Sequence, residues 1–196
     1  ITSTDEITDL SDRAGEEFFD LFIPEGNHAL CALVQVTGFM QVINGAPGAS
    51  GPVIDHFSRD AVSRFLERMS ESIEPVTGPL SGHLRALFTD SMELEGSNWT
   101  GDMREEFFRR RGYDIFPYLP FVLFRTGSMG NVTDWKYGVE TGPALKDMIC
   151  RMRYDFEKTK AELLEERFMQ AFAGWCRKLG VSSRMQAYGR GFFPLE

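Results

Sequence analysis

The pattern of apolar and polar positions first predicts β structure. Residues 16–43 contain an apolar run at 18–23, a turn signal at Pro24-Glu25-Gly26, and an alternating segment at 29–36. Alternation with a period of two, bounded by a Pro-Gly turn, predicts two adjacent strands. Residues 44–51, Asn-Gly-Ala-Pro-Gly-Ala-Ser-Gly, have the composition of a loop that ends this region.

After the loop, apolar residues recur at the spacing of a helix. Ser58 is the predicted N-cap of a helix that ends at Pro75 and Gly78-Pro79, and its apolar face comprises Val62, Phe65, Leu66, Met69 and Ile73. The apolar segment 84–88 predicts a buried strand with polar side chains at its C-terminal end.

Three further elements complete the pattern. Thr100 is the predicted cap of a second helix that runs to Arg111 with Gly112 after it, residues 143–179 form the longest helix, and residues 182–188 form a strand. Alternating helices and strands favour an α/β fold with a parallel sheet. An open doubly wound sheet and a section of a (β/α) TIM barrel fit this order equally well. In both folds, chemistry lies at the C-terminal ends of the strands, so we expect residues 90–98 and 186–190 to share one face.

Charge and composition exclude several functions. The 21 Lys and Arg and 29 Asp and Glu give a net charge of -8, and residues 1–26 alone carry eight acids and one base. An acidic chain argues against a nucleic-acid partner. Residues 27–54 lack charged side chains, yet their most apolar part, 29–43, is shorter than the roughly 20 residues of a membrane span. The sequence lacks a glycine-rich phosphate loop, a Gly-x-Ser-x-Gly elbow and close Cys or His spacing.

The segment 88–100 is the strongest candidate for chemistry. It places the carboxylates of Asp90, Glu93 and Glu95, the amide of Asn98 and the indole of Trp99 behind one strand. Carboxylates and amides bond sugar hydroxyls, an aromatic face stacks on sugar C–H groups, and a carboxylic acid can protonate a departing oxygen. The same residues also fit a structural explanation, with solvated loop acids, a backbone-capping Asp90 and a core aromatic Trp99.

Four motifs resemble glycoside hydrolase family 106, the α-L-rhamnosidases, over nearly the whole chain. They are the turn 24–26, the segments 46–48 through 55–58, Asp90-Ser91-Met92-Glu93 with Asn98-Trp99-Thr100, and 104–107 through 110–114 with 117–120. The resemblance implies an (α/β) barrel enzyme that hydrolyses terminal α-L-rhamnosides with inversion and uses Ca²⁺. A complete barrel needs about 250 residues, so we expect partial (β/α) TIM-barrel units preceded by a small β-strand region. The corresponding domains are the C-terminal part of a β region at 1–43, a linker at 44–54, and part of the catalytic barrel at 55–196.

The resemblance also implies roles for residues. Glu93 matches the motif glutamate and becomes the candidate general acid. The substrate-binding candidates are Asp90, Ser91, Asn98, Trp99, Gln186 and Tyr188. An inverting glycosidase also needs a general base roughly 6.5–9.5 Å from the acid, and the resemblance implies that this base lies beyond Glu196. We therefore expect the isolated chain to be inactive.

Partners and location follow from the same resemblance. We expect a rhamnose-containing oligosaccharide or polysaccharide, contact with the rest of a parent chain, and a bacterial protein exported to the periplasm or secreted. The alternative is a non-catalytic fragment or degenerate module that binds carbohydrate or only packs against its parent.

Overall fold

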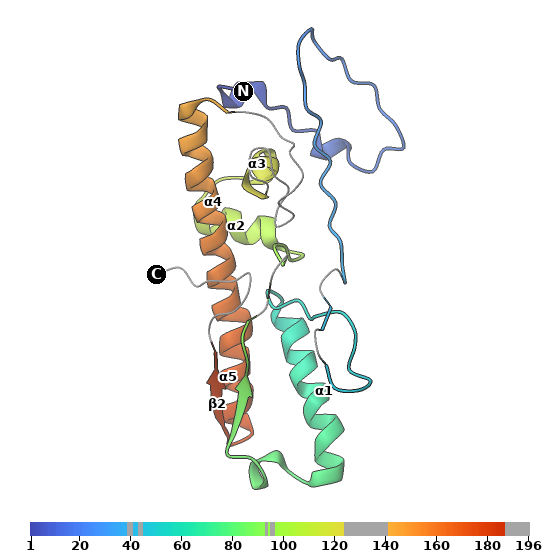
Figure 1. Cartoon of the computed structure of the whole chain (residues 1–196), viewed down its shortest axis with the longest axis vertical. Helices are drawn as coiled ribbons and strands as arrows, with labels where there is room; N and C mark the ends of the chain where they lie inside the picture. The colour runs from blue at the N-terminus through green and yellow to red at the C-terminus, as the bar shows by residue number, and fades with distance from the viewer. Residues whose placement is uncertain (39–40, 43–44, 93, 95–96, 124–140, 187–196) are drawn as a thin grey trace. The chain divides into compact units, whose positions relative to one another are not determined.

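A computed structural model describes residues 1–38, 41–42, 45–92, 94, 97–123 and 141–186. Its helices are α1 (Arg59–Thr77), α2 (Met103–Arg111), α3 (Leu119–Leu123), α4 (Pro143–Leu164) and α5 (Gln170–Lys178), and its strands are β1 (Ala86–Thr89) and β2 (Ser182–Met185) (Figure 1). The chain forms two compact units, residues 1–35 with 104–156 and residues 36–103 with 157–196. The mixture of helices and strands confirms an α/β composition, whereas the (β/α) barrel and the predicted domain boundaries stay predictions.

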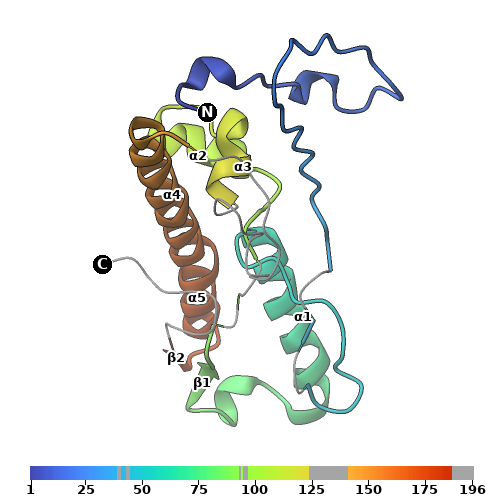
Figure 2. The same ribbon diagram turned by 45° about the horizontal axis from the view of Figure 1, so that its top comes forward.

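The second unit contains a parallel pair of strands covered by helices. β1 and β2 pair from Ala86 opposite Ser182 to Thr89 opposite Met185. α5 packs against β2 and against α1 (Figure 2). The parallel direction brings the C-terminal ends of both strands to one edge, as the sequence predicted.

α1 begins at the predicted cap and ends at one of the two predicted end signals. The Ser58 hydroxyl accepts a hydrogen bond from the Ala61 N–H at 3.3 Å, and Val62 and Leu66 are buried. Of the two predicted end signals, Gly78-Pro79 is confirmed: the helix passes Pro75, continues to Thr77 and stops at Gly78, whose φ is +80°. A proline in the last turn of a helix removes only one backbone hydrogen bond, and the helix can continue past it. A residue with a positive φ ends the helix.

The long C-terminal helix is confirmed, with one irregularity. α4 passes through a π-helical segment, Glu165–Met169, directly into α5, and Gly180 follows with a φ of +71°. Its predicted apolar face is buried over most of its length. The buried side chains are Leu145, Ile149, Met152, Phe156, Leu163, Leu164, Phe168, Phe172 and Cys176.

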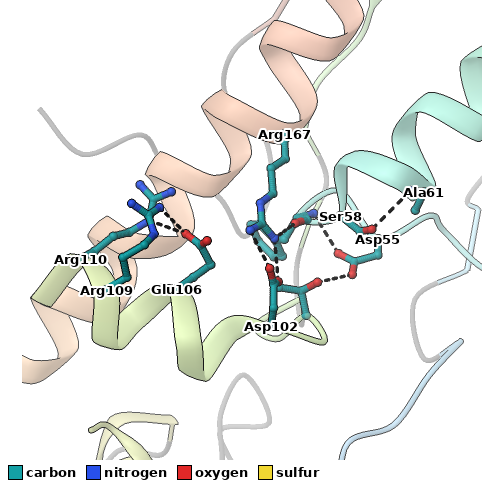
Figure 3. A network of polar contacts seen from close by, with 10 residues as sticks. Asp55, Ser58, Ala61, Asp102, Glu106, Arg109, Arg110 and Arg167 are labelled. Carbon is teal, nitrogen blue, oxygen red and sulfur yellow. Dashed lines mark hydrogen bonds and ion pairs between the residues drawn. The ribbon is translucent and has the colours of Figure 1, made fainter. Parts of the chain in front are cut away.

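The first unit is built around α2 and the segment that follows it. Phe107 is fully buried, and its ring meets the edge of Tyr113 with centroids 5.0 Å apart. The Tyr113 hydroxyl donates to the Asp155 carboxylate at 3.1 Å. In the last two turns of α2, Arg109 and Arg110 both bond the Glu106 carboxylate, at 2.6 and 3.0 Å (Figure 3). The basic residues that end α2 therefore take part in contacts within this helix.

The strands predicted between residues 16 and 43 are wrong for the described part of that region. It contains isolated bridges, Ala14 with Glu16 and Gln41 with Pro52, but no strand. Phe18, Phe22 and Val34 are 82%, 89% and 79% exposed. A two-stranded hairpin is marginal in water unless its apolar face packs on something else. The alternating pattern shows that these side chains suit a strand. A strand also needs a packed surface that buries its apolar face, and the pattern does not show whether one is present.

The described helices also show whether any of them could span a membrane. No helix among them is both long enough and apolar enough to cross a bilayer.

Candidate active site

The candidate segment starts where β1 ends. Asp90 is exposed and its carboxylate accepts a hydrogen bond from the backbone N–H of Ser91 at 2.8 Å. The Ser91 hydroxyl lies 3.4 Å from the same carboxylate oxygen. The backbone-capping role considered for Asp90 is therefore present, and it orients the carboxylate beside the strand end.

The second strand brings Gln186 to the same edge. Its backbone N–H donates to the Thr89 carbonyl at 3.0 Å, so the pairing of β1 and β2 extends by one residue. Gln186 is half-buried. The backbone at Asp90 and Gln186 therefore lies at one edge of the sheet, as predicted. Glu93, Glu95 and Tyr188 lie outside the described residues.

Two described residues of the candidate segment are buried apolar side chains. Met92 and Leu94, the neighbours of Glu93 in sequence, are each 3% exposed. The Ser97 N–H donates to the Leu94 carbonyl at 2.9 Å. Asn98 is exposed and Trp99 is half-buried. An exposed amide and a partly exposed indole are compatible with sugar binding.

Thr100 has a different role from the one predicted. α2 begins three residues later, at Met103, and the Thr100 hydroxyl donates to the Asp55 carboxylate at 2.6 Å. The other Asp55 oxygen accepts the Phe57 N–H at 2.9 Å. Thr100 is 3% exposed. Helix capping depends on local sequence, whereas this bond depends on a residue 45 positions earlier, so the pattern of α2 alone could not predict it.

Arg167 makes the second polar connection to this region. Its guanidinium donates to both carboxylate oxygens of Asp102, at 2.7 and 2.8 Å, and to the Phe57 carbonyl at 2.9 Å (Figure 3). The hydrogen bond from Arg167 is the main cause that lowers the pKa of Asp102 below its usual range. Arg167 lies in the π-helical segment of the long helix, and such segments often occur at functional sites.

These groups line an open polar cleft of about 500 Å³. Its walls carry Asp55, Ser58, Arg59, Asp60, Thr100, Gly101, Asp102 and Arg167. Sequence reasoning gave no functional role to Asp55 or Arg167. The signal that was available for Asp55 was its place three residues before the helix cap Ser58, whereas Arg167 is one of many charged residues in the long helix.

His56 is adjacent to this cluster but does not fit a catalytic role. Its ring packs 4.8 Å from that of Phe168, and its Nδ1 lies 3.0 Å from the Ile54 carbonyl. Burial lowers the pKa of His56. A half-buried imidazole that packs on a phenylalanine and bonds to backbone fits a structural role.

The described residues were also tested for a metal site. Within them, no group of three or more His, Cys, Asp or Glu side chains is arranged to hold a metal ion.

Comparison with known proteins decides the family. The model of glycoside hydrolase family 106, described as alpha-L-rhamnosidase, matches residues 2–193. The chain belongs to this family.

Two relatives of this chain are much longer than it is. A rhamnosidase from Novosphingobium sp. PP1Y has a similar structure, with a TM-score of 0.57 and 28% identity, over 76% of this chain and 13% of that one. A protein from Formosa agariphila named "Putative beta-glucuronidase" is 28% identical over 150 residues, which are 76% of this chain and 12% of the relative. The family 106 chain therefore spans about one-eighth of the length of the relatives that it matches.

Proposed function

We propose that these residues form part of an enzyme that hydrolyses terminal α-L-rhamnosides with inversion, with Glu93 as the general acid. The observation that carries the proposal is the family match over residues 2–193, together with a motif of acids at the C-terminal end of β1. In α/β folds, catalytic residues lie at the C-terminal ends of the strands. Carboxylates at this position therefore suit glycoside hydrolysis.

The proposed reaction needs two carboxyl groups with different tasks. The Glu93 carboxylic acid gives its proton to the glycosidic oxygen as the bond from that oxygen to the anomeric carbon breaks. A general base on the opposite face takes a proton from water, whose oxygen forms the new bond to the anomeric carbon. We assign that base to a residue beyond Glu196, because the amide of Gln186 can bind a hydroxyl but cannot accept a proton as a base.

The proposed substrate site lies beside this acid. Asp90, Ser91, Asn98 and Gln186 offer acceptors and donors to sugar hydroxyls, and the indole of Trp99 offers a face for sugar C–H groups. Tyr188 belongs to the proposal through its place after β2. The substrate is a rhamnose-containing oligosaccharide or polysaccharide, and the isolated chain is inactive in this proposal.

The experiment is an assay of the full-length polypeptide that carries these residues. We expect hydrolysis of an aryl α-L-rhamnoside, release of the β-anomer of rhamnose, and a loss of at least 100-fold in kcat for Glu93→Gln, since general acid catalysis contributes about 10²–10⁴-fold. An aryl β-D-glucuronide serves as the second substrate, because one relative carries the name of a glucuronidase. Unchanged rhamnoside hydrolysis in Glu93→Gln would contradict the assignment of the acid.

A matched control distinguishes loss of the acid from loss of the fold. Arg151→Gln removes an exposed ion pair with Asp147 on α4, so its kcat should equal that of the wild type. Failure of the wild type to hydrolyse any rhamnoside, with sugar binding retained, would instead favour the alternative of a non-catalytic carbohydrate-binding module.

Calcium and export belong to the proposal through the family resemblance alone. Treatment with EDTA should lower rhamnoside hydrolysis by the full-length protein, and added Ca²⁺ should restore it. Fractionation of the source bacterium should recover the protein from the periplasm or the medium.

A further inference from the structure

Residues 29–35 carry apolar side chains that the described structure leaves in contact with water. The segment lies in the first unit, in a stretch without helix or strand that Figure 1 draws as a thin trace. Leu30 and Val34 are each 79% exposed, Leu33 is 39% exposed, and Cys31 is also exposed. Single exposed apolar residues are ordinary on a protein surface, but a concentration of them marks an interaction surface.

The backbone of this segment also lacks partners. Among the described residues, no hydrogen bond between backbone groups involves residues 17–35. The contacts nearby are local, since Arg13 donates to the Asp20 carbonyl and the Nε2 of His28 lies 2.9 Å from the Pro24 carbonyl oxygen. Buried N–H and C=O groups are almost always paired. Whatever covers the apolar side chains must therefore also offer hydrogen bonds to the backbone.

A neighbouring β-strand meets both needs. A helix or a lipid surface could cover the apolar side chains, but neither has free backbone groups to offer along its length. A strand at a sheet edge pairs the backbone, and the sheet around it buries the side chains. The segment has no charged residue, and as a strand it would place Leu30 and Val34 on one face and Cys31 and Leu33 on the other. Apolar side chains on both faces are typical of strands that are covered on both sides.

We propose that residues 29–35 form a strand of a β-sheet whose other strands come from the same polypeptide, outside residues 1–196. The chain spans about one-eighth of the length of the relatives that it matches, so proteins of this family are long enough to supply them. Residues 1–26 carry eight acids and one base. Pairing with a second copy would bring these like charges together, which disfavours it. The proposal requires no catalysis and is independent of rhamnoside hydrolysis.

The cysteines of this chain allow a direct test in the full-length protein. Cys31 lies in the segment, Cys150 is exposed on α4, and Cys176 is buried. We expect N-ethylmaleimide to modify Cys31, like Cys176, at least about 100-fold more slowly in the native protein than in urea, with Cys150 as the exposed control. Mass spectrometry of the digested protein measures each rate. Native labelling of Cys31 within about threefold of its rate in urea would overturn the proposal.

Amide hydrogen exchange separates strand pairing from mere coverage. We expect the amides of residues 29–35 in the full-length protein to exchange at least about 100-fold more slowly than their intrinsic rates. Slow labelling of Cys31 combined with unprotected amides would show that another kind of surface covers the segment, and the proposed strand would be wrong.

Two substitutions at Val34 test the packing of one face. Val34→Lys places an ammonium group where an apolar side chain packs, whereas Val34→Thr keeps the branched shape that suits a strand. Val34→Lys should speed the labelling of Cys31 at least about tenfold, and Val34→Thr less than about threefold. Val76→Lys, at a valine on α1 that is 86% exposed, is the matched control. Equal rates at Cys31 in Val34→Lys and Val76→Lys would contradict the packed strand. If Val34→Lys does not fold, the labelling and exchange rates of the wild type decide.

Dilution identifies the source of the neighbouring strand. Protection of Cys31 that is unchanged over an about 100-fold dilution, in a protein that light scattering shows to be a monomer, supports a strand from the same polypeptide. Protection that falls on dilution, together with the mass of a dimer, would assign the strand to a second copy and overturn the proposal. Rhamnoside hydrolysis by the same preparation bears on the proposed function alone.

Discussion

The backbone N–H of Gln186 donates to the carbonyl of Thr89 at 3.0 Å, one residue beyond the last register pair of β1 and β2. The two residues are 97 positions apart in the sequence. Because the strands are parallel, this bond brings the residue after β2 beside the residue that precedes Asp90. The chain thereby gathers polar side chains from two distant segments at one sheet edge.

Gln186 should act in substrate binding rather than in proton transfer. On the proposed function, we expect Gln186→Ala to raise KM by about 2–10-fold, with kcat changed less, since a neutral hydrogen bond contributes about 0.5–1.5 kcal/mol. Steady-state kinetics on an aryl α-L-rhamnoside measure both constants. Ser183→Ala, an exposed position within β2, is the control. A fall in kcat at constant KM would contradict a binding role.

The Arg167–Asp102 pair should give local stability that depends on pH. Since Arg167 lowers the pKa of Asp102 in the folded state, the contribution is present above the unfolded value of about 3.9 and is lost as the pH falls through the lower folded value. Asp102→Asn should reduce the protection of the amides of residues 97–103 at pH 7 by at most about 1 kcal/mol, because the carboxylate is half exposed.

Hydrogen exchange at pH 7 and pH 3, corrected for the intrinsic rate at each pH, measures this difference. We expect the gap between wild type and Asp102→Asn to shrink at pH 3. Asp147→Asn, in an exposed pair on α4, should leave these amides unchanged. A gap that widens at pH 3 would show that the ion pair is not its source.

Two adjacent phenylalanines on α2 should differ sharply in their effect on stability. Phe107 is fully buried and contacts Tyr113, whereas Phe108 is 56% exposed. Phe107→Ala should destabilise the protein by about 3–5 kcal/mol through a cavity, and Phe108→Ala should have a much smaller effect. Thermal unfolding of the purified full-length variants compares them. Equal losses of Tm would show that Phe107 is not a core residue.

Gly112 should be needed for its backbone conformation alone. Its φ is +81°, and a Cβ added there would meet nothing within 4 Å. Gly112→Ala should therefore cost roughly 1–2 kcal/mol from the left-handed conformation. Gly82→Ala is the matched control, since its Cβ also meets nothing within 4 Å and no positive φ applies. Urea unfolding of the full-length variants should show a loss in Gly112→Ala alone.

Local rules explain the features that the sequence predicted well. The N-cap Ser58, the end of α2 before Gly112 and the long apolar face of α4 and α5 each depend on residues within a turn or two of one another. Helical periodicity, capping and positive-φ glycines are encoded at that range. Family motifs likewise required no coordinates, because the residues themselves carry the resemblance.

The side-chain hydrogen bonds between distant segments could be seen only in the tertiary structure. Thr100 meets Asp55, and Arg167 meets Asp102, across 45 and 65 positions. The alternation at residues 29–36 failed as a predictor for a related reason, since a strand forms only where a neighbouring strand or packed face completes it. The sequence by itself determined the family, α1, α2, the long helix of α4 and α5, and the acid-bearing motif. The fold decided which polar side chains meet, because hydrogen bonding depends on distances of about 3 Å that no spacing in the sequence specifies.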